Sequence, residues 1–330
     1  MKSESRVSVI GSVNIDEFYY VNKIAAPGET VQSTKLDVRV GGKGFNQAAA
    51  VACCLIHVEL FAAIGSNNYD MIYEYSKEFP FLDAHLIKID NIETGKAFIQ
   101  KSNAENCIVL LPGANVFLSP SHLSFSSASE YIILQNETSI DLKFLINMDS
   151  GLKIVYNPSP FKKVDVSDLM KVDYLFINSS EFECLIALLE IDKVNNINHS
   201  LDLIGQKLPA TSIVLSLGGK GLYSLFDGRK KFYSVYPSSN VVDSTGCGDV
   251  LLGFFVGALS ILDRPATREE HVQLKAWKNT KNNITDREAA LLVGICAASL
   301  ALEYEGCAPS ISLDAVIKRL SEEKIKMEVQ

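Results

Sequence analysis

The 330-residue sequence has no stretch that approaches the roughly 20 consecutive apolar residues needed for a membrane-spanning helix. Its first residues, MKSESRVSVIG, lack the apolar segment of a signal peptide. Positive charge is also in short supply, and a formal net charge of -8 argues against a general binder of nucleic acid or of anionic membranes. These absences predict a globular protein of the cytosol, or of the nucleus, that binds neither nucleic acid nor membrane.

Cysteine and histidine show no recognisable pattern. The seven cysteines form no C-x-x-C pair and lie mostly in apolar runs, so we expect reduced thiols in the core. The five histidines form no H-x-x-x-H pair, and no protein-bound zinc site is expected. A Walker loop is missing too, as is a G-x-G-x-x-G after the first strand, which argues against an NAD-dependent dehydrogenase.

The chain does contain an alternation of short Val/Ile-rich runs with longer helical patterns. This rhythm predicts βαβ units and a mostly parallel sheet with helices on both faces, where ligands bind beyond the carboxyl ends of the strands. The expected strands are 6–11, 58–65, 131–135, 152–157, 172–178 and 211–218. The expected helices are 43–55, 69–79, 139–149, 179–190 and 199–207.

Four regions depart from the alternation. Residues 15–40 and 94–113 hold strand-like segments without helices between them, which predicts a small antiparallel sheet that projects as a lid from a single domain. Asp227-Gly228 between two apolar runs predicts a β-hairpin over 222–236. The polar stretch 263–288 is expected at the surface.

The segment 240–262, NVVDSTGCGDVLLGFFVGALSIL, carries the strongest chemical signal. A strand end is followed by a glycine-rich turn, and Asp249 stands where an apolar helix begins. Free N–H groups and the positive dipole end of a helix favour an anion, so the pattern predicts a phosphate site that contains a carboxylate. Asp249 then has two interpretations: it complements the helix dipole, or it is a general base beside an anion hole.

A second set of polar residues flanks the predicted lid. GSVNID (11–16) follows the first strand, and GGKGFNQ (41–47) opens a helix. Asn14, Asp16, Lys43 and Asn46 offer the mixed donors and acceptors that a polyol requires, although each alone is also typical of a turn or a helix cap.

Together these motifs resemble the ribokinase-like, phosphofructokinase-B family of sugar kinases. The resemblance spans about residues 7–310 and rests on GSVNID, PGET (27–30), GGKGFNQAAA (41–50), TGKA (94–97), PGAN (112–115), NPSP (157–160), SLGGKG (216–221) and DSTGCGD (243–249). It implies a three-layer α/β fold and transfer of a phosphoryl group from ATP, with Mg²⁺ and K⁺, to the primary hydroxyl of a sugar. GGKGxNQA together with PGAN favours D-ribose, which would give ribose 5-phosphate.

The resemblance also implies roles for individual residues. Asp249 would be the base, with an anion hole formed by the backbone amides of Gly246, Cys247 and Gly248. The sugar would contact Asn14, Asp16, Gly42, Lys43, Asn46, Glu137 and Asp249. The nucleotide would contact Asn178, Ser216, Leu217, Gly218, Gly219, Lys220, Gly221, Gly248 and Ile295, while Glu181 would act on magnesium through water. Potassium would be held by Asp243, Thr245, Ala301, Tyr304, Gly306 and Ser310.

Some positions depart from the family pattern. Asn178-Ser179-Ser180-Glu181 lacks the first glutamate of the usual N-E-x-E, which affects the expected positioning of the metal. Cys247 replaces an alanine, Val250 a threonine or serine, and Ile295 a polar residue. None of these changes removes a group that the reaction requires.

Other functions remain open from the sequence. Another sugar or nucleoside kinase of the same family would carry the same motifs, and an inactive sugar-binding regulator would use the same scaffold. The lid strands EFYYVN (17–22) and NCIVLLPG (106–113) are too apolar to stay exposed, which predicts a homodimer through the lid.

Overall fold

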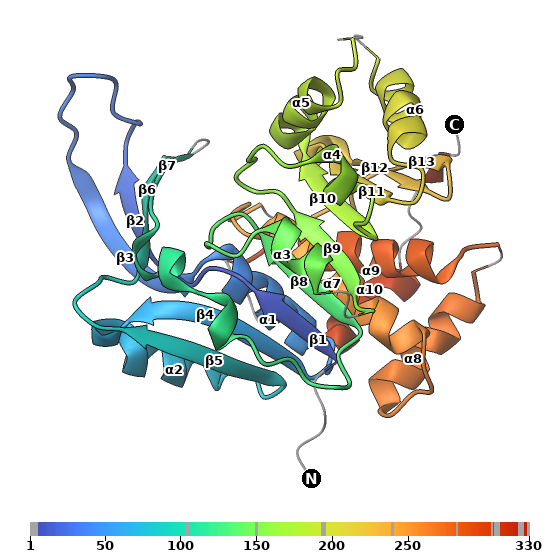
Figure 1. Cartoon of the computed structure of the whole chain (residues 1–330), viewed down its shortest axis with the longest axis horizontal. Coiled ribbons are helices and arrows are strands. Elements are labelled where there is room, and N and C mark those ends of the chain that lie inside the picture. The colour runs from blue at the N-terminus through green and yellow to red at the C-terminus, as the bar shows by residue number, and fades with distance from the viewer. Residues whose placement is uncertain are drawn as a thin grey trace.

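The computed structural model describes residues 6–102, 106–148, 151–192, 196–238, 241–281, 283–304, 306, 311–322 and 327–328. In this part of the chain a ten-stranded sheet has the order β14-β13-β12-β11-β10-β9-β8-β1-β4-β5 (Figure 1). Pairing is parallel from β11 to β5 and antiparallel among β11, β12, β13 and β14. The strands are β1 (Val7–Ile10), β4 (Val58–Gly65), β5 (Leu82–Ile89), β8 (Tyr131–Gln135), β9 (Lys153–Asn157), β10 (Tyr174–Asn178), β11 (Ser212–Ser216), β12 (Leu222–Phe226), β13 (Arg229–Tyr233) and β14 (Met327–Glu328).

Helices cover both faces of this sheet, which confirms the predicted three-layer α/β fold. Successive side chains of a strand point to opposite faces, so Tyr131 and Ile133 of β8 enter one core, and Ile132 and Leu134 enter the other. The first core is closed by α1 (Lys43–Cys53), α2 (Tyr69–Ser76), α7 (Cys247–Leu262), α8 (Glu269–Asn279), α9 (Asp286–Ala301) and α10 (Leu313–Glu322). The second is closed by α3 (Leu142–Asn147), α4 (Val166–Leu169), α5 (Ser179–Leu188) and α6 (Ile197–Lys207).

The predicted lid is a separate four-stranded sheet that projects from one end of the body (Figure 1). Its order is β3 (Ser33–Gly41), β2 (Asn14–Val21), β6 (Gly95–Lys101), β7 (Asn106–Leu111). The two outer pairs are antiparallel, and the central pair β2–β6 is parallel because β2 and β6 each leave the body in the same direction. Ile99 and Ile108 on one face of the lid line a cavity together with Asp249 at the start of α7, so this face lies over the carboxyl end of the main sheet.

Several elements were not expected from the sequence, among them β5, β14, α4, α8, α9 and α10. Strand β5 has a mixed burial pattern and pairs with β4 at the edge of the sheet. The prediction that 263–288 lies at the surface is wrong in part, because α8 forms within it and buries His271, Leu274 and Trp277. Trp277 Nε1 donates to the Leu320 carbonyl oxygen at 3.2 Å, so this helix is fixed against α10. Across the described ranges, every helix is too short or too polar to cross a bilayer.

Candidate active site

Two adjoining cavities lie beyond the carboxyl ends of the parallel strands. The larger has a volume of about 260 Å³ and reaches under the lid, and the smaller has a volume of about 130 Å³ and lies at the ends of β9, β10 and β11. Lys43, Ser159, Gly246 and Asp249 line both cavities. A group that moves from one cavity to the other must therefore pass these four residues.

Asp249 lies in the first turn of α7 and is 7% exposed. The first turn of α1 places two amides against its carboxylate: Asn46 Nδ2 donates to Oδ2 at 3.2 Å, and Gln47 Nε2 donates to Oδ1 at 2.8 Å. The helices approach closely because α7 carries Gly253, where a Cβ would lie 2.7 Å from the Gln47 carbonyl oxygen. The orientation of the Asp249 carboxylate is thus set by α1.

A chain of buried amides continues behind Asp249. A carboxylate only accepts hydrogen bonds, so Gln47 must turn its NH₂ toward Asp249 and its Oε1 away. That oxygen accepts a hydrogen bond from Gln135 Nε2 at 2.6 Å, and Gln47 Nε2 also lies 3.3 Å from Asn157 Oδ1. Gln47, Gln135 and Asn157 were not predicted as site residues, although Gln47 lies in the motif GGKGFNQAAA and Asn157 in NPSP.

The larger cavity gathers all six residues predicted to bind a sugar besides Asp249. Their side chains or backbones line it together with apolar residues of the lid, Ala97, Ile99, Ile108 and Leu110. The six are Asn14, Asp16, Gly42, Lys43, Asn46 and Glu137. Asn46 Oδ1 is buried without a hydrogen-bond partner in the described structure, so it can accept from a ligand hydroxyl. The cavity therefore suits a small polyol under an apolar cover.

Asn115 of the motif PGAN, which was not predicted as a site residue, holds the Asn14 side chain in place. Asn115, which is 1% exposed, donates from Nδ2 to Asn14 Oδ1 at 2.8 Å and accepts at Oδ1 from the Val13 backbone N–H at 3.0 Å. Gly42 has a φ of 93°, and a Cβ there would lie 2.7 Å from the Ser12 carbonyl oxygen. Only glycine lets the loop before α1 close on β2 at this point.

Glu137 closes the floor of the same cavity. Ser12 Oγ donates to its Oε2 in a short hydrogen bond. Burial raises the pKa of Glu137 above its ordinary value, and the nearby Lys43 and the Ser12 hydroxyl oppose that rise. The carboxyl is therefore poorly solvated without a ligand, and a sugar hydroxyl would supply a hydrogen bond to it.

The glycine-rich turn before α7 follows a segment that is not a strand, so the predicted strand end at 241–242 is wrong, and Val241 is 66% exposed. Gly246 caps the helix with a left-handed φ of 77°, and Gly246 and Gly248 line the smaller cavity at the start of α7, while the Cys247 backbone N–H donates to the Ser244 carbonyl oxygen at 3.4 Å. Burial raises the pKa of Cys247 to about 12, and the carboxylates of Asp243 and Asp249 add to this rise. The thiol is therefore neutral at physiological pH and is not a nucleophile.

The smaller cavity contains the N-x-x-E residues at the start of α5. Asn178 Oδ1 accepts from the Glu181 backbone N–H at 3.0 Å, while Glu181 Oε2 accepts from the Asn178 backbone N–H at 2.9 Å. This capping box is their structural role, and both residues also line the cavity with Asp249. Oxygen ligands from two carboxylates thus face one space.

The predicted nucleotide loop follows β11. Ser216 lines the smaller cavity, and Gly218, Gly219 and Lys220 are exposed, with open space beside the two glycines. Ile295 lies on α9, is 3% exposed and belongs to the first core. Its expected contact with adenine stays a prediction.

The two segments predicted to hold potassium lie side by side. The backbone N–H groups of Val242 and Asp243 donate to the Leu302 carbonyl oxygen at 2.7 and 3.3 Å. Asp243 is 6% exposed, and its Oδ1 accepts from the Thr245 backbone N–H at 3.0 Å. Ala301, Tyr304 and Gly306 belong to the neighbouring segment, and Ser310 lies outside the described residues.

Comparison with known proteins identifies the family to which the chain belongs. The profile of the pfkB family of carbohydrate kinases matches residues 4–313. The chain is 28% identical to a ribokinase of Staphylococcus aureus, over 94% of this chain and 97% of the relative. It is 29% identical to a ribokinase of Haemophilus influenzae, over 77% and 85%. A deoxyribokinase of Salmonella typhi is 26% identical over 76% and 84%.

Solved structures give the same result. A ribokinase of Cryptococcus neoformans in complex with ADP is 29% identical, with a TM-score of 0.76 over 96% of this chain and 100% of that one. A ribokinase of Thermotoga maritima is 25% identical, with a TM-score of 0.78 over 97% of this chain and 100% of that one.

Proposed function

This chain belongs to the pfkB family of carbohydrate kinases, and on that premise we propose that it transfers the γ-phosphoryl group of ATP to the primary hydroxyl of D-ribose. The products would be ADP and ribose 5-phosphate. The observation that carries the proposal is the position of Asp249, which lines both a polyol-sized cavity and the cavity at the carboxyl ends of the strands. Relatives named ribokinase, and one solved with ADP, support the same substrates.

In the proposed reaction Asp249 accepts the proton of the sugar hydroxyl as that oxygen attacks the γ-phosphorus. Gln47 and Asn46 hold the carboxylate in a fixed orientation, so little reorganisation is needed when the proton moves. The amides of Gly246, Cys247 and Gly248 stabilise the charge on the transferred group, and Lys43 lies where it can follow that group between the cavities.

Magnesium fits the smaller cavity. The ion prefers hard oxygen ligands and keeps several waters, and Glu181, which is 5% exposed, lines this cavity beside Asp249. Glu181 and Asn178 would contact the ion through water, in keeping with their engagement in the capping box. When bound with ATP, the ion neutralises phosphate charge.

Potassium is the proposed second cation, beside Asp243. A single carboxylate with the backbone oxygens of Thr245, Ala301, Tyr304 and Gly306 suits one large monovalent ion in charge and in donor type. We expect potassium to raise turnover several-fold while lithium does not, and Asp243→Ala to abolish that difference. Equal rates in the two salts would contradict a potassium site.

The ribose assignment is tested by an ADP-release assay over ribose, 2-deoxyribose, fructose 6-phosphate and adenosine. A ring of buried polar groups rejects an analogue that lacks a matched hydroxyl, because its own groups are left unpaired. Ribose should therefore give the highest kcat/KM. If 2-deoxyribose wins, the second candidate, a deoxyribokinase like the Salmonella relative, takes its place. Ribose binding without ADP release would instead indicate an inactive regulator.

The lid supports two further proposals. We expect the 330 residues to act as one kinase domain whose small sheet closes over the sugar. The outer face of the lid exposes apolar side chains, including Leu36, Val38, Phe98 and Val109, of which Val109 is 62% exposed. We expect this face to pair with a second copy of the chain. The six cysteines in the described ranges are free thiols, which suits the cytosol or the nucleus, but only Cys54 and Cys296 lie in the core as predicted, and Cys107 and Cys184 are exposed.

A further inference from the structure

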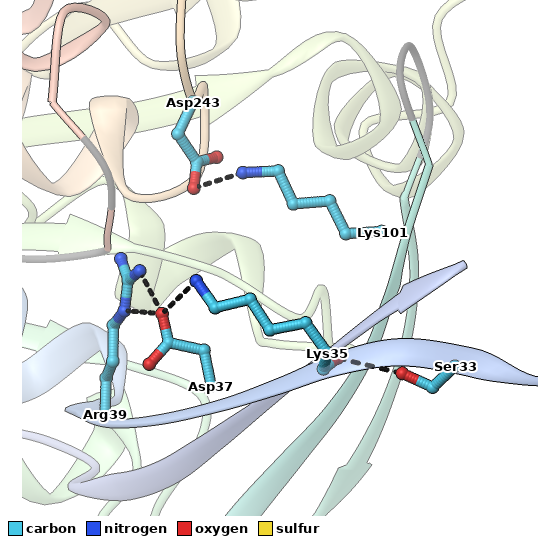
Figure 2. Close-up of polar contacts among 6 residues, drawn as sticks. All are labelled: Ser33, Lys35, Asp37, Arg39, Lys101 and Asp243. Atoms are coloured by element: carbon cyan, nitrogen blue, oxygen red, sulfur yellow. Dashed lines mark hydrogen bonds and ion pairs between the residues drawn. The ribbon is translucent and has the colours of Figure 1, made fainter. Parts of the chain in front are cut away.

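One lid side chain reaches the turn that precedes α7. Lys101 is the last residue of β6, and its Nζ lies 2.8 Å from Asp243 Oδ2 (Figure 2). The two side chains are 19% and 4% exposed, so the pair is largely withdrawn from water. The contact joins residues 142 positions apart in sequence, one on the lid and one on the body.

A second basic lid residue meets the neighbouring segment of the predicted potassium site. Arg39 of β3 lies against Gly306, with Nη1 2.6 Å from the place where a Cβ would stand. Asp37 holds the guanidinium, with 3.0 Å between Arg39 Nε and Asp37 Oδ2, and Lys35 Nζ lies 3.9 Å from the same oxygen (Figure 2). The inner face of the lid therefore touches both segments that the family resemblance assigns to the cation.

The charge on Asp243 needs a partner because the carboxylate is buried. Burial alone would raise the pKa of Asp243, but the hydrogen bonds from Lys101 and from the Thr245 backbone amide lower it below its ordinary value. A potassium ion at this carboxylate would stand next to the Lys101 ammonium, and the two positive charges would repel each other. The carboxylate thus has one charge to balance and two candidate cations.

We propose that Lys101 is a positioning residue whose ammonium group balances the charge of Asp243. Because Lys101 lies on the lid, closure of the lid over the sugar also orders the anion-hole turn from Asp243 to Gly248. Potassium and the Lys101 ammonium are then alternative cations at one carboxylate. This inference rests on the proposed kinase function. It assigns a part in turnover to Lys101, which does not line the sugar cavity.

The experiment compares Lys101→Met, which removes the charge and keeps the apolar stem, with Lys101→Arg, which keeps the charge. Lys35→Met is the matched control, since Lys35 lies on the same lid face but is 58% exposed and has Asp37 as its carboxylate partner. In lithium buffer Lys101→Met should lower kcat roughly tenfold, the effect of losing one charge-assisted hydrogen bond, with KM for MgATP unchanged. Potassium should restore more of the rate in this variant than it adds to the wild type.

A second readout does not depend on catalysis. A cation that binds only the folded state raises the melting temperature, so the difference between potassium and lithium chloride at equal ionic strength should be larger for Lys101→Met than for the wild type or Lys35→Met. This comparison tests the inference even if ribose proves not to be the substrate. Lys101→Met that matches Lys35→Met in both readouts would overturn the proposal. A loss of rate that potassium leaves unrepaired would overturn the exchange of cations.

Discussion

Replacing Asp249 by asparagine removes the proposed general base and keeps a side chain of the same shape at that position. The new NH₂ group must face one of two donors, Gln47 Nε2 or Asn46 Nδ2, which lie 2.8 and 3.2 Å from the present carboxylate oxygens. The conflict with Asn46 has a remedy in the structure. Asn46 Oδ1 is buried without a partner among the described residues, so this amide can flip, whereas Gln47 is held because its Nε2 also faces Asn157 Oδ1 at 3.3 Å.

The magnitudes therefore differ between stability and catalysis. Charge-assisted hydrogen bonds become neutral ones while a buried charge is removed, and we expect the free energy of unfolding to change by no more than about 1–2 kcal/mol. That corresponds to a few degrees in melting temperature. Loss of a positioned general base costs about 10²–10⁴-fold in kcat, or roughly 3–5 kcal/mol in the activation barrier.

The assay is single-turnover phosphorylation of ribose by Asp249→Asn, run beside calorimetric titration with ATP and a thermal melt. We expect a folded variant that binds ATP as the wild type does and turns over at least about a hundred times more slowly. A kcat close to that of the wild type would show that Asp249 serves the helix dipole and not proton transfer. An unfolded variant would refute the proposed flip of the Asn46 amide.

Asp16→Ala should raise the apparent KM for ribose by roughly tenfold, because a buried sugar hydroxyl loses its partner, and should leave the KM for ATP unchanged. Initial-rate measurements test this prediction. An unchanged KM for ribose would show that Asp16 does not contact the sugar. Burial raises the pKa of Glu137, so its ionised form costs stability as the pH rises through that raised value. Glu137→Gln should therefore raise the melting temperature more in alkaline than in acidic buffer. Equal gains at both pH values would show that ionised Glu137 does not destabilise the fold. Val109→Asp should shift a dimer to monomer in sedimentation velocity; a wild type that is already monomeric would remove the basis of the lid dimer.

The sequence alone predicted much of the main sheet and the key carboxylate. Short Val/Ile-rich runs marked β1, β4 and β8 to within about a residue because a parallel strand buried on both faces is mostly apolar, even though these strands also bury Ser8, Glu59 and Gln135. The edge strand β5 escaped notice because its burial is mixed, and α8 escaped because its polar residues outnumber its buried ones. Asp249 could be predicted as a site residue because a glycine-rich turn before an apolar helix is typical of an anion-binding site.

Only the tertiary structure revealed which partners these residues have. Gln47 lies 202 positions before Asp249 and Lys101 lies 142 positions before Asp243, and each of these side chains is equally plausible at a solvated surface. Local propensity acts over one or two turns of chain, whereas a hydrogen bond between buried side chains depends on where whole helices and sheets pack. The sequence therefore shows which polar residues are present. The hydrogen bonds behind Asp249 and the contact between Lys101 and Asp243 form only because α1, α7 and β6 meet at one edge of the sheet.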